Sequence, residues 1–191
     1  MSHAPERADA RANRQRILDA AVQVIAERGG NAEIKDVAER AGVGVGTIYR
    51  NFATKDDLFR GVVEETLQRL YAVRDQALAL DDPAESVGAY IQGMFEILEQ
   101  WSPALSAMIA GAFTEEMKSR FMEFTEDRRI EAIFHRGIAL GVFRRDLSVE
   151  LARGLLVSTC DPVVFLALRA AVTREQMADG YTDLILRALR A

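Results

Sequence analysis

The sequence predicts an all-α protein, with three short N-terminal helices followed by a larger helical bundle. Only four of the 191 residues are proline, and alanine, leucine, arginine and glutamate, which favour helices, are abundant. Apolar residues recur at helical spacing along most of the chain, whereas the alternation expected of a strand is hard to find. With 49% hydrophobic and 28% charged residues, the composition is that of a globular protein with a real core.

The first three helices are expected before residue 53. A helix over about 10–28 has one apolar face and ends at the Gly29-Gly30-Asn31 sequence. A short helix over about 32–41 has a second apolar stripe, and a third is expected over about 45–52. Three alternate glycines between positions 42 and 46 form the turn that joins the last two helices.

The bundle is expected to begin with a long helix over about 54–80. Thr54 and Asp57 open this helix as a capping box, with aspartate in place of the usual glutamate. The next helix starts near residue 84, and we expect Trp101-Ser102-Pro103 to interrupt it before a short apolar piece that ends near residue 113.

The C-terminal part should hold a long helix over about 114–140, a loop over 141–147, and a helix that follows Ser148 and reaches about residue 170. Asp161-Pro162 should kink or split that helix, because proline cannot donate the interior hydrogen bond. Thr173 with Gln176 then marks the start of the last helix, which runs to about residue 189.

The glycine-rich stretch RAGVGVGTIYRNFATKDDL, residues 40–58, leaves two alternatives: a phosphate cradle for a nucleotide, or a turn between two helices that bind DNA. A dinucleotide fingerprint needs G-x-G-x-x-G after a strand. Here the spacing is G-x-G-x-G, and the preceding KDVAERA has helical spacing. A P-loop needs a lysine before its serine or threonine, whereas Thr47 follows Gly46. Both nucleotide sites are therefore excluded.

A helix-turn-helix fits the same residues, since it needs two short helices joined by a few residues that often include glycine. At about 100° per residue, Val45, Ile48 and Phe52 fall within about 60° of one another and should form the buried face of the second helix. The remaining positions carry hydroxyl, amide and guanidinium groups, and a glycine that lets a backbone approach a duplex closely. These positions are Gly46, Thr47, Tyr49, Arg50 and Asn51.

This region resembles the DNA-binding domain of the TetR family of transcriptional regulators. The matching stretches are RQRILDAA (14–21), ERGG (27–30), DVAERAGV (36–43), GTIYRNF (46–52) and TKDDL (54–58). The stretch RGIALGVFRRDL (136–147) is similar, more loosely, to one common in that family's second domain. The resemblance implies a helix-turn-helix DNA-binding domain over 10–55 and an effector-binding and dimerisation domain over 56–191.

The resemblance also implies individual roles at the DNA interface. Thr47 and Arg50 would face the major groove, whereas Tyr49 and Lys55 would contact phosphates, which supply affinity and register. The predicted DNA-binding residues are therefore Gly46, Thr47, Tyr49, Arg50, Asn51 and Lys55.

Two positions depart from the family's pattern. Gly44 stands where a serine often caps the recognition helix, and glycine at such a position costs only a few tenths of a kcal/mol. Glu33 stands where a threonine or serine often touches a phosphate, and a carboxylate cannot donate that hydrogen bond.

Large apolar side chains and one histidine in the middle helices are expected, as a group, to wall an effector pocket, although each alone is more simply a core residue. They are Phe95, Trp101, Met108, Phe113, Met117, Phe121, Phe124, Phe134 and His135. His135 has a packing role as its simplest interpretation. Because no HExxH motif or Cys/His cluster occurs, we expect no metal, and the sequence indicates no cofactor.

Charge and cysteine content limit the partners and the compartment. Residues 1–60 hold 10 Lys+Arg and 9 Asp+Glu, a balance of +1, so the remaining 14 and 20 leave −6 for 61–191. This asymmetry permits DNA binding. Arg7 and Arg11 either form an arm that reaches DNA or belong to a solvated tail, and the tail is expected. Cys160 is the single cysteine, and no targeting or membrane segment is evident, so we expect a cytoplasmic protein without a disulfide.

The sequence therefore predicts a DNA-binding transcriptional regulator, a repressor that binds a palindromic operator as a homodimer and is released by a small apolar effector. The last helices, over about 148–170 and 174–189, are expected to form the dimer seam. Two alternatives stay open: a helical-bundle enzyme or carrier with a vestigial helix-turn-helix, and an activator. No nucleophile, base and orienting group supports the enzyme. The operator, the effector and the regulated genes are not specified.

Overall fold

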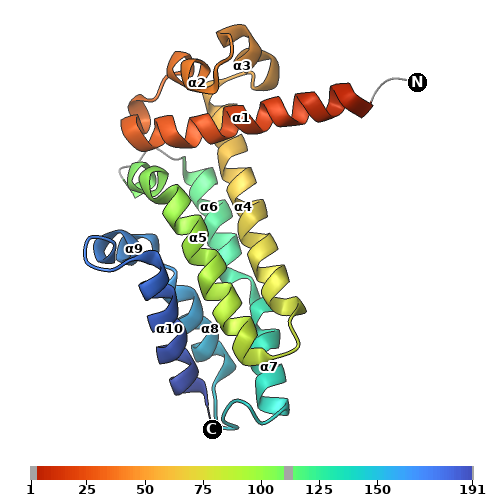
Figure 1. The fold of residues 1–191 in the computed structure, drawn as a ribbon, viewed down its shortest axis with the longest axis vertical. Coiled ribbons are helices and arrows are strands. Elements are labelled where there is room, and N and C mark those ends of the chain that lie inside the picture. Colours follow the sequence, from red (N-terminus) through yellow and green to blue (C-terminus); the bar gives the residue numbers. More distant parts are fainter. Residues whose placement is uncertain (1–3, 110–113, 191) are drawn as a thin grey trace. The chain divides into compact units, whose positions relative to one another are not determined.

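The computed structural model describes residues 4–109 and 114–190, and all regular elements in these ranges are helical (Figure 1). The chain forms two compact units. The first comprises residues up to 66 together with 101–119, and the second comprises 67–100 together with the residues from 120 onward. The predicted all-α fold class is therefore confirmed.

The first unit contains the three helices that the sequence predicted before residue 53. They are α1 (Ala4–Arg28), α2 (Ile34–Ala41) and α3 (Val45–Asn51), and the beginning of α4 (Lys55–Ala79) follows them. A 3-10 turn, Gly29–Asn31, ends α1, and Gly29 has a φ of 55°, a value that suits glycine. Ile17, Ala21 and Ile25 are fully buried on α1, which confirms its predicted apolar face.

The helix α1 begins earlier than the sequence predicts. The helix begins at Ala4 and not near residue 10, so Arg7 and Arg11 stand within a helix and not in an irregular tail. The apolar stripe that marks a buried helix starts only at Ile17, and the preceding residues are polar or small. A helical segment of polar and small residues gives no periodic apolar signal.

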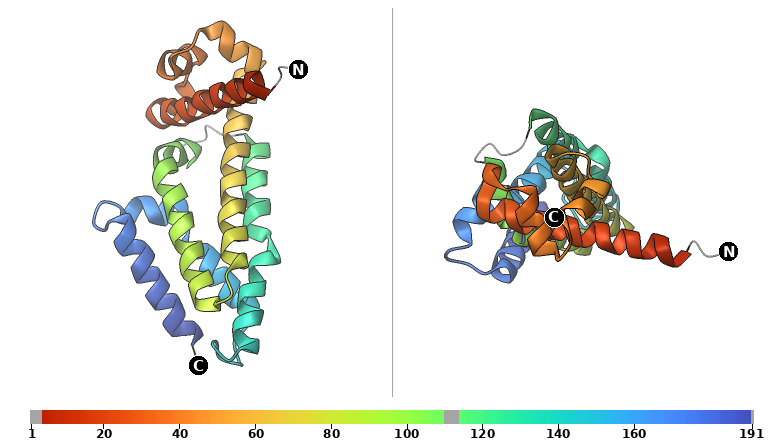
Figure 2. Two further views of the ribbon diagram at one scale, coloured as in Figure 1. Left: turned by 45° about the vertical axis from the view of Figure 1, so that its right-hand side comes forward. Right: turned by 90° about the horizontal axis from the view of Figure 1, so that it is seen from above.

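The second unit is a bundle built from the remaining helices. They are the rest of α4, most of α5 (Pro83–Ile109), the part of α6 (Glu115–Glu126) from Arg120 onward, α7 (Glu131–Ala139), α8 (Val149–Thr159), α9 (Pro162–Leu168) and α10 (Arg174–Leu189). In this unit α10 lies beside α8 and α5 (Figures 1 and 2). The ring of Phe95 on α5 lies 5.7 Å from the ring centroids of both Phe165 on α9 and Tyr181 on α10.

The predicted interruption at Trp101-Ser102-Pro103 is wrong, because α5 continues through these residues to Ile109. A proline inside a helix removes one hydrogen bond and crowds the preceding turn. Here Leu98 and Trp101, on the turn before the proline, are buried. The burial of such apolar side chains offsets a local cost of this size.

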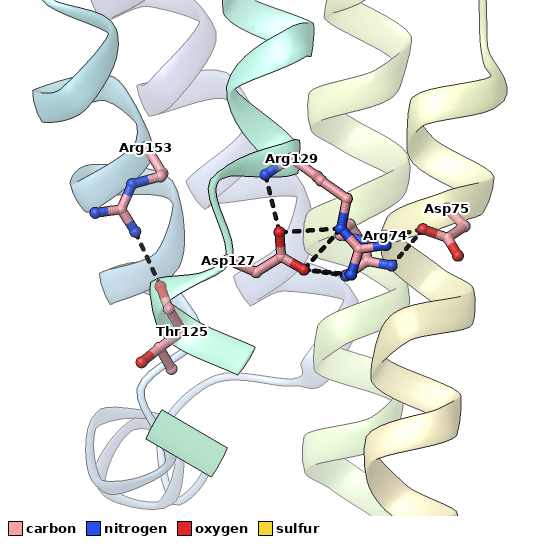
Figure 3. A network of polar contacts seen from close by, with 6 residues as sticks. All are labelled: Arg74, Asp75, Thr125, Asp127, Arg129 and Arg153. Carbon is pink, nitrogen blue, oxygen red and sulfur yellow. Dashed lines mark hydrogen bonds and ion pairs between the residues drawn. The ribbon is translucent and has the colours of Figure 1, made fainter. Parts of the chain in front are cut away.

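The single long helix predicted over 114–140 is also wrong, because the chain leaves the helical path at Asp127 (Figure 3). The Asp127 carboxylate accepts a hydrogen bond from the backbone N–H of Arg129 at 2.9 Å and so caps a 3-10 turn, Arg128–Ile130. The guanidinium of Arg74 on α4, which is 3% exposed, pairs with Asp127 and lies 2.6 Å from Asp75. Aspartate competes with the helical backbone in this way, and spacing rules do not detect a partner 53 residues away.

Charge pairing at the break also affects protonation. Hydrogen bonds from Arg129, together with the nearby Arg74 cation, hold the pKa of the Asp127 carboxyl below its usual range. The folded protein therefore favours the ionised carboxylate of Asp127, which neutralises the charge of the buried Arg74. Close by, Arg153 on α8 donates a hydrogen bond of 2.9 Å to the Thr125 carbonyl at the end of α6 (Figure 3).

The predicted caps of the C-terminal helices are confirmed. Ser148 accepts a hydrogen bond from the Leu151 N–H and begins α8, and Thr173 forms a capping box with Gln176 at the start of α10. Asp161 caps α9, with Pro162 in its first turn, and α8 and α9 meet at a bend of 49°. Proline at a first helical turn loses no hydrogen bond that the helix would have made.

The loop after α7 packs against α7 and against the end of α10. Phe143 is fully buried, and an added Cβ on Gly137 would come within 2.0 Å of its ring, so glycine permits this contact. The Arg144 N–H donates to the Leu189 carbonyl at 2.9 Å, which ties the loop to the end of α10.

Cys160, next to the bend between α8 and α9, is buried, and burial raises the pKa of its thiol to about 12. A thiol in that state is a poor nucleophile. Within the described residues, no single helix has the length and apolar composition of a membrane span, and α8 and α9 have them only as a bent pair.

Candidate nucleic-acid interface

The turn between α2 and α3 is a glycine cap of defined geometry. Gly42 has a φ of 66°, and its N–H bonds to the Glu39 carbonyl while the N–H of Val43 bonds to the Ala38 carbonyl at 3.0 Å. This pair of hydrogen bonds is a Schellman motif, which satisfies the last carbonyls of a helix and reverses the chain. Gly42 is therefore required by its backbone conformation.

Gly44 has a different role, since its backbone angles of −71° and 147° are open to any residue. Its carbonyl accepts the first hydrogen bond of α3, from the Thr47 N–H at 2.8 Å, and no side chain caps the helix. An added Cβ on Gly44 would meet no heavy atom within 4 Å. The missing side-chain cap expected from the sequence is confirmed.

Ion pairs hold α2 against the end of α1. The Asp36 carboxylate, which is 9% exposed, accepts hydrogen bonds from Arg28 at 2.9 Å and from the backbone N–H of Glu33 at 3.2 Å. Arg40 on α2 forms a bidentate pair with Glu27 at 2.9 and 2.7 Å. The hydrogen bond from Arg40 lowers the pKa of the Glu27 carboxyl. These pairs join residues 8 and 13 positions apart, which no helical spacing rule relates.

The buried side of α3 is narrower than the sequence predicted. Ile48 and Phe52 are buried, but Val45 is 41% exposed, so its predicted place in the buried face is wrong. Val45 is the first residue of the helix, and the packed part of α3 is its C-terminal turn. A helical wheel gives the direction of a side chain but not its depth in the domain.

Phe52 follows α3 and anchors it between α1 and α4. The guanidinium carbon of Arg14 lies 4.6 Å from the centroid of the Phe52 ring, a cation–π contact. An added Cβ on Gly61 would come within 2.8 Å of the same ring. The close approach of α4 to Phe52 therefore depends on glycine at position 61. Neither contact was predicted from the sequence, although Arg14 lies one turn from Leu18, on the buried side of α1.

The opposite side of α3 presents polar groups to solvent. Tyr49 is 53% exposed, and Arg50 and Asn51 are exposed beside it. Arg50 donates to the Thr47 hydroxyl at 2.8 Å, and the Asn51 amide donates to the Thr47 carbonyl at 2.8 Å. Each of these bonds holds a side chain close to the helix until a competing acceptor replaces it.

The rest of the interface is set by a glycine and by the start of α4. Gly46 is exposed, and an added Cβ would have no neighbour within 4 Å, so the helix surface is open there. Lys55 is the first residue of α4, and its ammonium lies 5.2 Å from the Phe59 ring centroid. Thr54 and Asp57 form the predicted capping box around it, with the Asp57 N–H donating to the Thr54 hydroxyl at 3.0 Å.

This arrangement suits a polyanionic duplex. The α3 sequence, VGTIYRN, contains no acidic residue, and its exposed side offers hydroxyl, amide and guanidinium donors on a rigid element. An α-helix fits the major groove of B-DNA, where each base pair presents a distinct set of donors and acceptors. The six residues predicted to contact DNA lie on two consecutive elements, α3 and the first turn of α4.

The side chains expected to wall an effector pocket are divided between the two units. Trp101 and Met117 are buried in the first unit. In the second unit, Phe95, Phe124 and Phe134 are buried.

Phe124 and Phe134 pack against aromatic rings, those of Tyr71 at 5.3 Å and Phe143 at 6.3 Å. Phe121 is half-buried and His135 is exposed, so His135 does not join the buried side chains. Phe113 lies outside the described residues, as does the side chain of Met108. The effector pocket stays a prediction. Among the described residues, no group of three or more His, Cys, Asp and Glu side chains is placed to hold a metal ion.

The chain is similar to known transcriptional regulators over both of its units. Residues 17–62 match the family of bacterial regulatory proteins, tetR family. The HTH-type transcriptional repressor KstR2 of Mycobacterium tuberculosis is 27% identical over 182 residues, which cover 91% of this chain and 90% of that protein. The fatty acid metabolism regulator protein of Bacillus subtilis is 27% identical over 154 residues, 78% of this chain and 79% of its own.

Among solved structures, the TetR family transcriptional regulator PfmR of Thermus thermophilus superposes with a TM-score of 0.71 at 26% identity. The superposition covers 90% of this chain and 97% of that one. These relatives are regulators, and the likeness extends through both units and not through the helix-turn-helix alone.

The two glycines of the turn should respond in opposite ways to substitution. Gly42→Ala should lower the free energy of unfolding by about 1 kcal/mol, because φ of 66° is unfavourable for a residue with a Cβ. Gly44→Ser should raise it by a few tenths of a kcal/mol, since serine can cap the Thr47 N–H. Thermal unfolding at one fixed protein concentration measures both, and a loss of stability in Gly44→Ser would contradict the assignment.

Proposed function

Because this chain belongs to the TetR family of transcriptional regulators, we propose that it is a repressor that binds a palindromic operator as a homodimer and is released by a small apolar effector. The observation that carries the proposal is the two-sided character of α3, which buries Ile48 and exposes Tyr49 and Arg50. The name of the KstR2 relative, a transcriptional repressor, supports repression over activation.

We assign DNA binding to residues 10–55, with effector binding and dimerisation in 56–191. In the DNA complex Thr47 and Arg50 face base edges in the major groove, and Gly46 allows the helix to approach closely. Tyr49 and Lys55 contact phosphates, and Asn51 lies at the edge of the contact. The donors on α3 are already pointed along one side of a helix, so little ordering is needed on binding.

The short length of α3 favours a homodimer. One recognition helix contacts only a few base pairs, whereas a two-fold dimer places two helices about 34 Å apart, one turn of DNA. The exposed apolar side chains of α8 and α10 support a seam there. Leu151 and Leu155 on α8 are 76% and 44% exposed, and Leu184 on α10 is 64% exposed. These two helices contact each other within the chain, so their copies can complete a four-helix bundle.

Release by an effector would act through α4. This helix is continuous from Lys55 to Ala79, so its two ends belong to one element. An apolar molecule that binds in the 56–191 region and prefers a displaced α4 would move Lys55 and the adjoining α3, and would thereby change the separation of the two recognition helices. Only a difference in affinity between the two states can drive such a shift.

Substitutions at the DNA interface should separate affinity from base choice. Tyr49→Ala and Lys55→Ala should weaken binding to every duplex. Lys55→Ala should also reduce the slope of log K against log[salt] by about 0.9 for each protomer, whereas Tyr49→Ala removes no charge and should leave the slope unchanged. Arg50→Ala should cost about 1–3 kcal/mol on the preferred site and relax base preference. Selection of bound duplexes from a random library, followed by gel-shift titration of the selected site, measures both.

Arg120→Ala is the matched control, since Arg120 is an exposed arginine of α6 in the second unit and should leave DNA binding unchanged. If all three interface variants bound the selected site like the parent, the assignment would be wrong. A selected site without two inverted half-sites would contradict the palindromic operator.

The dimer seam can be tested with two leucines of equal exposure. Leu184→Glu should produce a monomer and abolish operator binding, because it buries a charge in the seam. Leu140→Glu, at a leucine 63% exposed beyond the end of α7, should leave a dimer that binds the operator. Sedimentation equilibrium gives the mass of each, and a dimeric Leu184→Glu variant would place the seam elsewhere.

Effector action can be measured as a change in operator affinity. A long-chain fatty acid is a suitable first probe, because it is apolar and the Bacillus subtilis relative is a fatty acid metabolism regulator. We expect a bound effector to weaken operator binding by at least about fivefold, the lower end of typical allosteric coupling. Calorimetry measures binding of the probe to the protein without DNA. A probe that binds but does not change operator affinity contradicts the mechanism.

A further inference from the structure

A buried arginine lies in the part of the chain to which we assign effector binding. Arg74 on α4 is 3% exposed, and its guanidinium pairs with Asp127, between α6 and α7 (Figure 3). Removing two charges from water is costly, so an apolar pair of similar volume is often equally stable. Such a pair therefore contributes little net stability, whereas a buried cation is well suited to bind an anion.

Two guanidinium groups converge on the Asp127 carboxylate. Arg129 donates to it through Nε at 2.9 Å and through Nη2 at 2.5 Å, and Arg74 donates through Nη1 (Figure 3). The guanidinium carbons of Arg74 and Arg129 also lie 4.7 and 5.9 Å from the centroid of the Tyr71 ring. Arginine matches the planar geometry of a carboxylate. Arg74, Arg129 and Tyr71 are here called the carboxylate seat.

Buried groups adjoin the carboxylate seat on α5 and α6. Phe124 on α6 is 7% exposed, and its ring packs edge-to-face on Tyr71 at 5.3 Å. Tyr90 on α5 is 2% exposed, and burial raises the pKa of its phenol, on which the charges of Arg74 and Asp127 also act. Arg129, in contrast, is 61% exposed. The carboxylate seat therefore has apolar neighbours on buried elements and one cation that an anion reaches from solvent.

The Asp127 carboxylate is the group of this cluster that can leave most easily. Asp127 stands between the end of α6 at Glu126 and the 3-10 turn Arg128–Ile130. A rotation of its side chain would bring the carboxylate into water at the cost of its hydrogen bond with the Arg129 N–H, and would leave α6 intact. Arg74, in contrast, is fixed in the interior of α4.

We propose that the apolar effector carries a carboxylate, and that this carboxylate replaces Asp127 between Arg74 and Arg129. The inference rests on the proposed release by an effector and names the chemical group that the protein recognises. Asp127 competes at a high effective concentration, because it belongs to the same chain. Burial of the apolar tail has to offset this competition. A fatty acid can therefore displace Asp127, whereas acetate cannot.

The exchange changes what α4 is attached to. In the free protein, Arg74 joins α4 to a segment 53 residues further along the chain, between α6 and α7. With the effector bound, Arg74 joins α4 to the effector, and the Asp127 segment loses its contact with α4. The effector thus makes contacts in one state that the other state does not offer, which is the condition for a shift between them.

The first test compares two probes with the same tail. Calorimetry with the full chain, without DNA, measures the affinity for decanoate and for decanol, of which only decanoate carries a charge at neutral pH. We expect the parent to bind decanoate more tightly. Arg74→Met keeps an unbranched side chain and removes the cation, so it should weaken decanoate binding at least about tenfold, the lower end for a hydrogen bond to a charged group. Decanol binding should not change.

The second test removes the internal competitor. Asp127→Asn keeps the side-chain shape and an oxygen that accepts from the Arg129 N–H, but it has no charge. If the carboxylate seat is open in about one parent molecule in ten or fewer, this variant should bind decanoate at least about tenfold more tightly. Asp75→Asn is the matched control, since Asp75 also pairs with Arg74 but is 61% exposed. Its decanoate affinity should equal that of the parent.

Chemical rescue measures the same seat through stability. Asp127→Ala leaves the space of a carboxylate beside Arg74, so sodium acetate should raise the melting temperature of this variant more than sodium chloride of equal ionic strength does. The parent, in which Asp127 fills the seat, should melt at the same temperature in both salts.

The inference would be overturned by a parent that binds decanoate and decanol equally, or that binds neither. It would also be overturned if Asp127→Asn bound decanoate no more tightly than Asp75→Asn. The comparison of the two probes in the parent needs no variant, so it decides the question even if a substitution prevents folding. Gel-shift titration of the unliganded parent scores operator binding separately. A parent that binds no duplex overturns the proposed repressor, whatever the probes do.

Discussion

The helix that we propose to face DNA, α3, is too short to be stable by itself. Isolated helices of fewer than about twelve residues are marginal in water, and α3 has seven. Its conformation therefore depends on the burial of Ile48 and Phe52 against the rest of the first unit. Phe52 contacts both the guanidinium of Arg14 on α1 and the backbone of α4 at Gly61, so one ring links α1, α3 and α4. The exposed polar side chains of α3 are therefore positioned by the packing of Phe52.

Ionic contacts refine the structure around that anchor in two distinct environments. The pair between Arg40 and Glu27 is exposed and bidentate, and it orients α2 while adding little stability. The pair between Arg74 and Asp127 is largely buried, so the loss of either partner would leave an uncompensated charge. The first kind sets the presentation of the helix-turn-helix, and the second fixes where the helical path of the second unit breaks.

Most helix boundaries could be predicted because their causes are local. Ser148, Asp161 and Thr173 each accept a hydrogen bond from a backbone N–H two or three residues later, and such caps are visible in the sequence. The two errors within the bundle arose where a distant contact outweighed a local preference. The burial of apolar side chains offsets the cost of Pro103 within α5, and the ion pair with Arg74 stabilises Asp127 outside a helix.

By itself, the sequence determined the all-helical class, the glycine turn and the identity of the polar residues on α3, because period and turn chemistry act over a few residues. It could not determine that Val45 is exposed, that Arg14 covers Phe52, or that α1 continues as a helix to Ala4. Depth of burial and side-chain partners depend on residues far away in the chain, and a helical segment of polar and small residues leaves no apolar pattern. Those features of the candidate interface were decided only when the first unit packed.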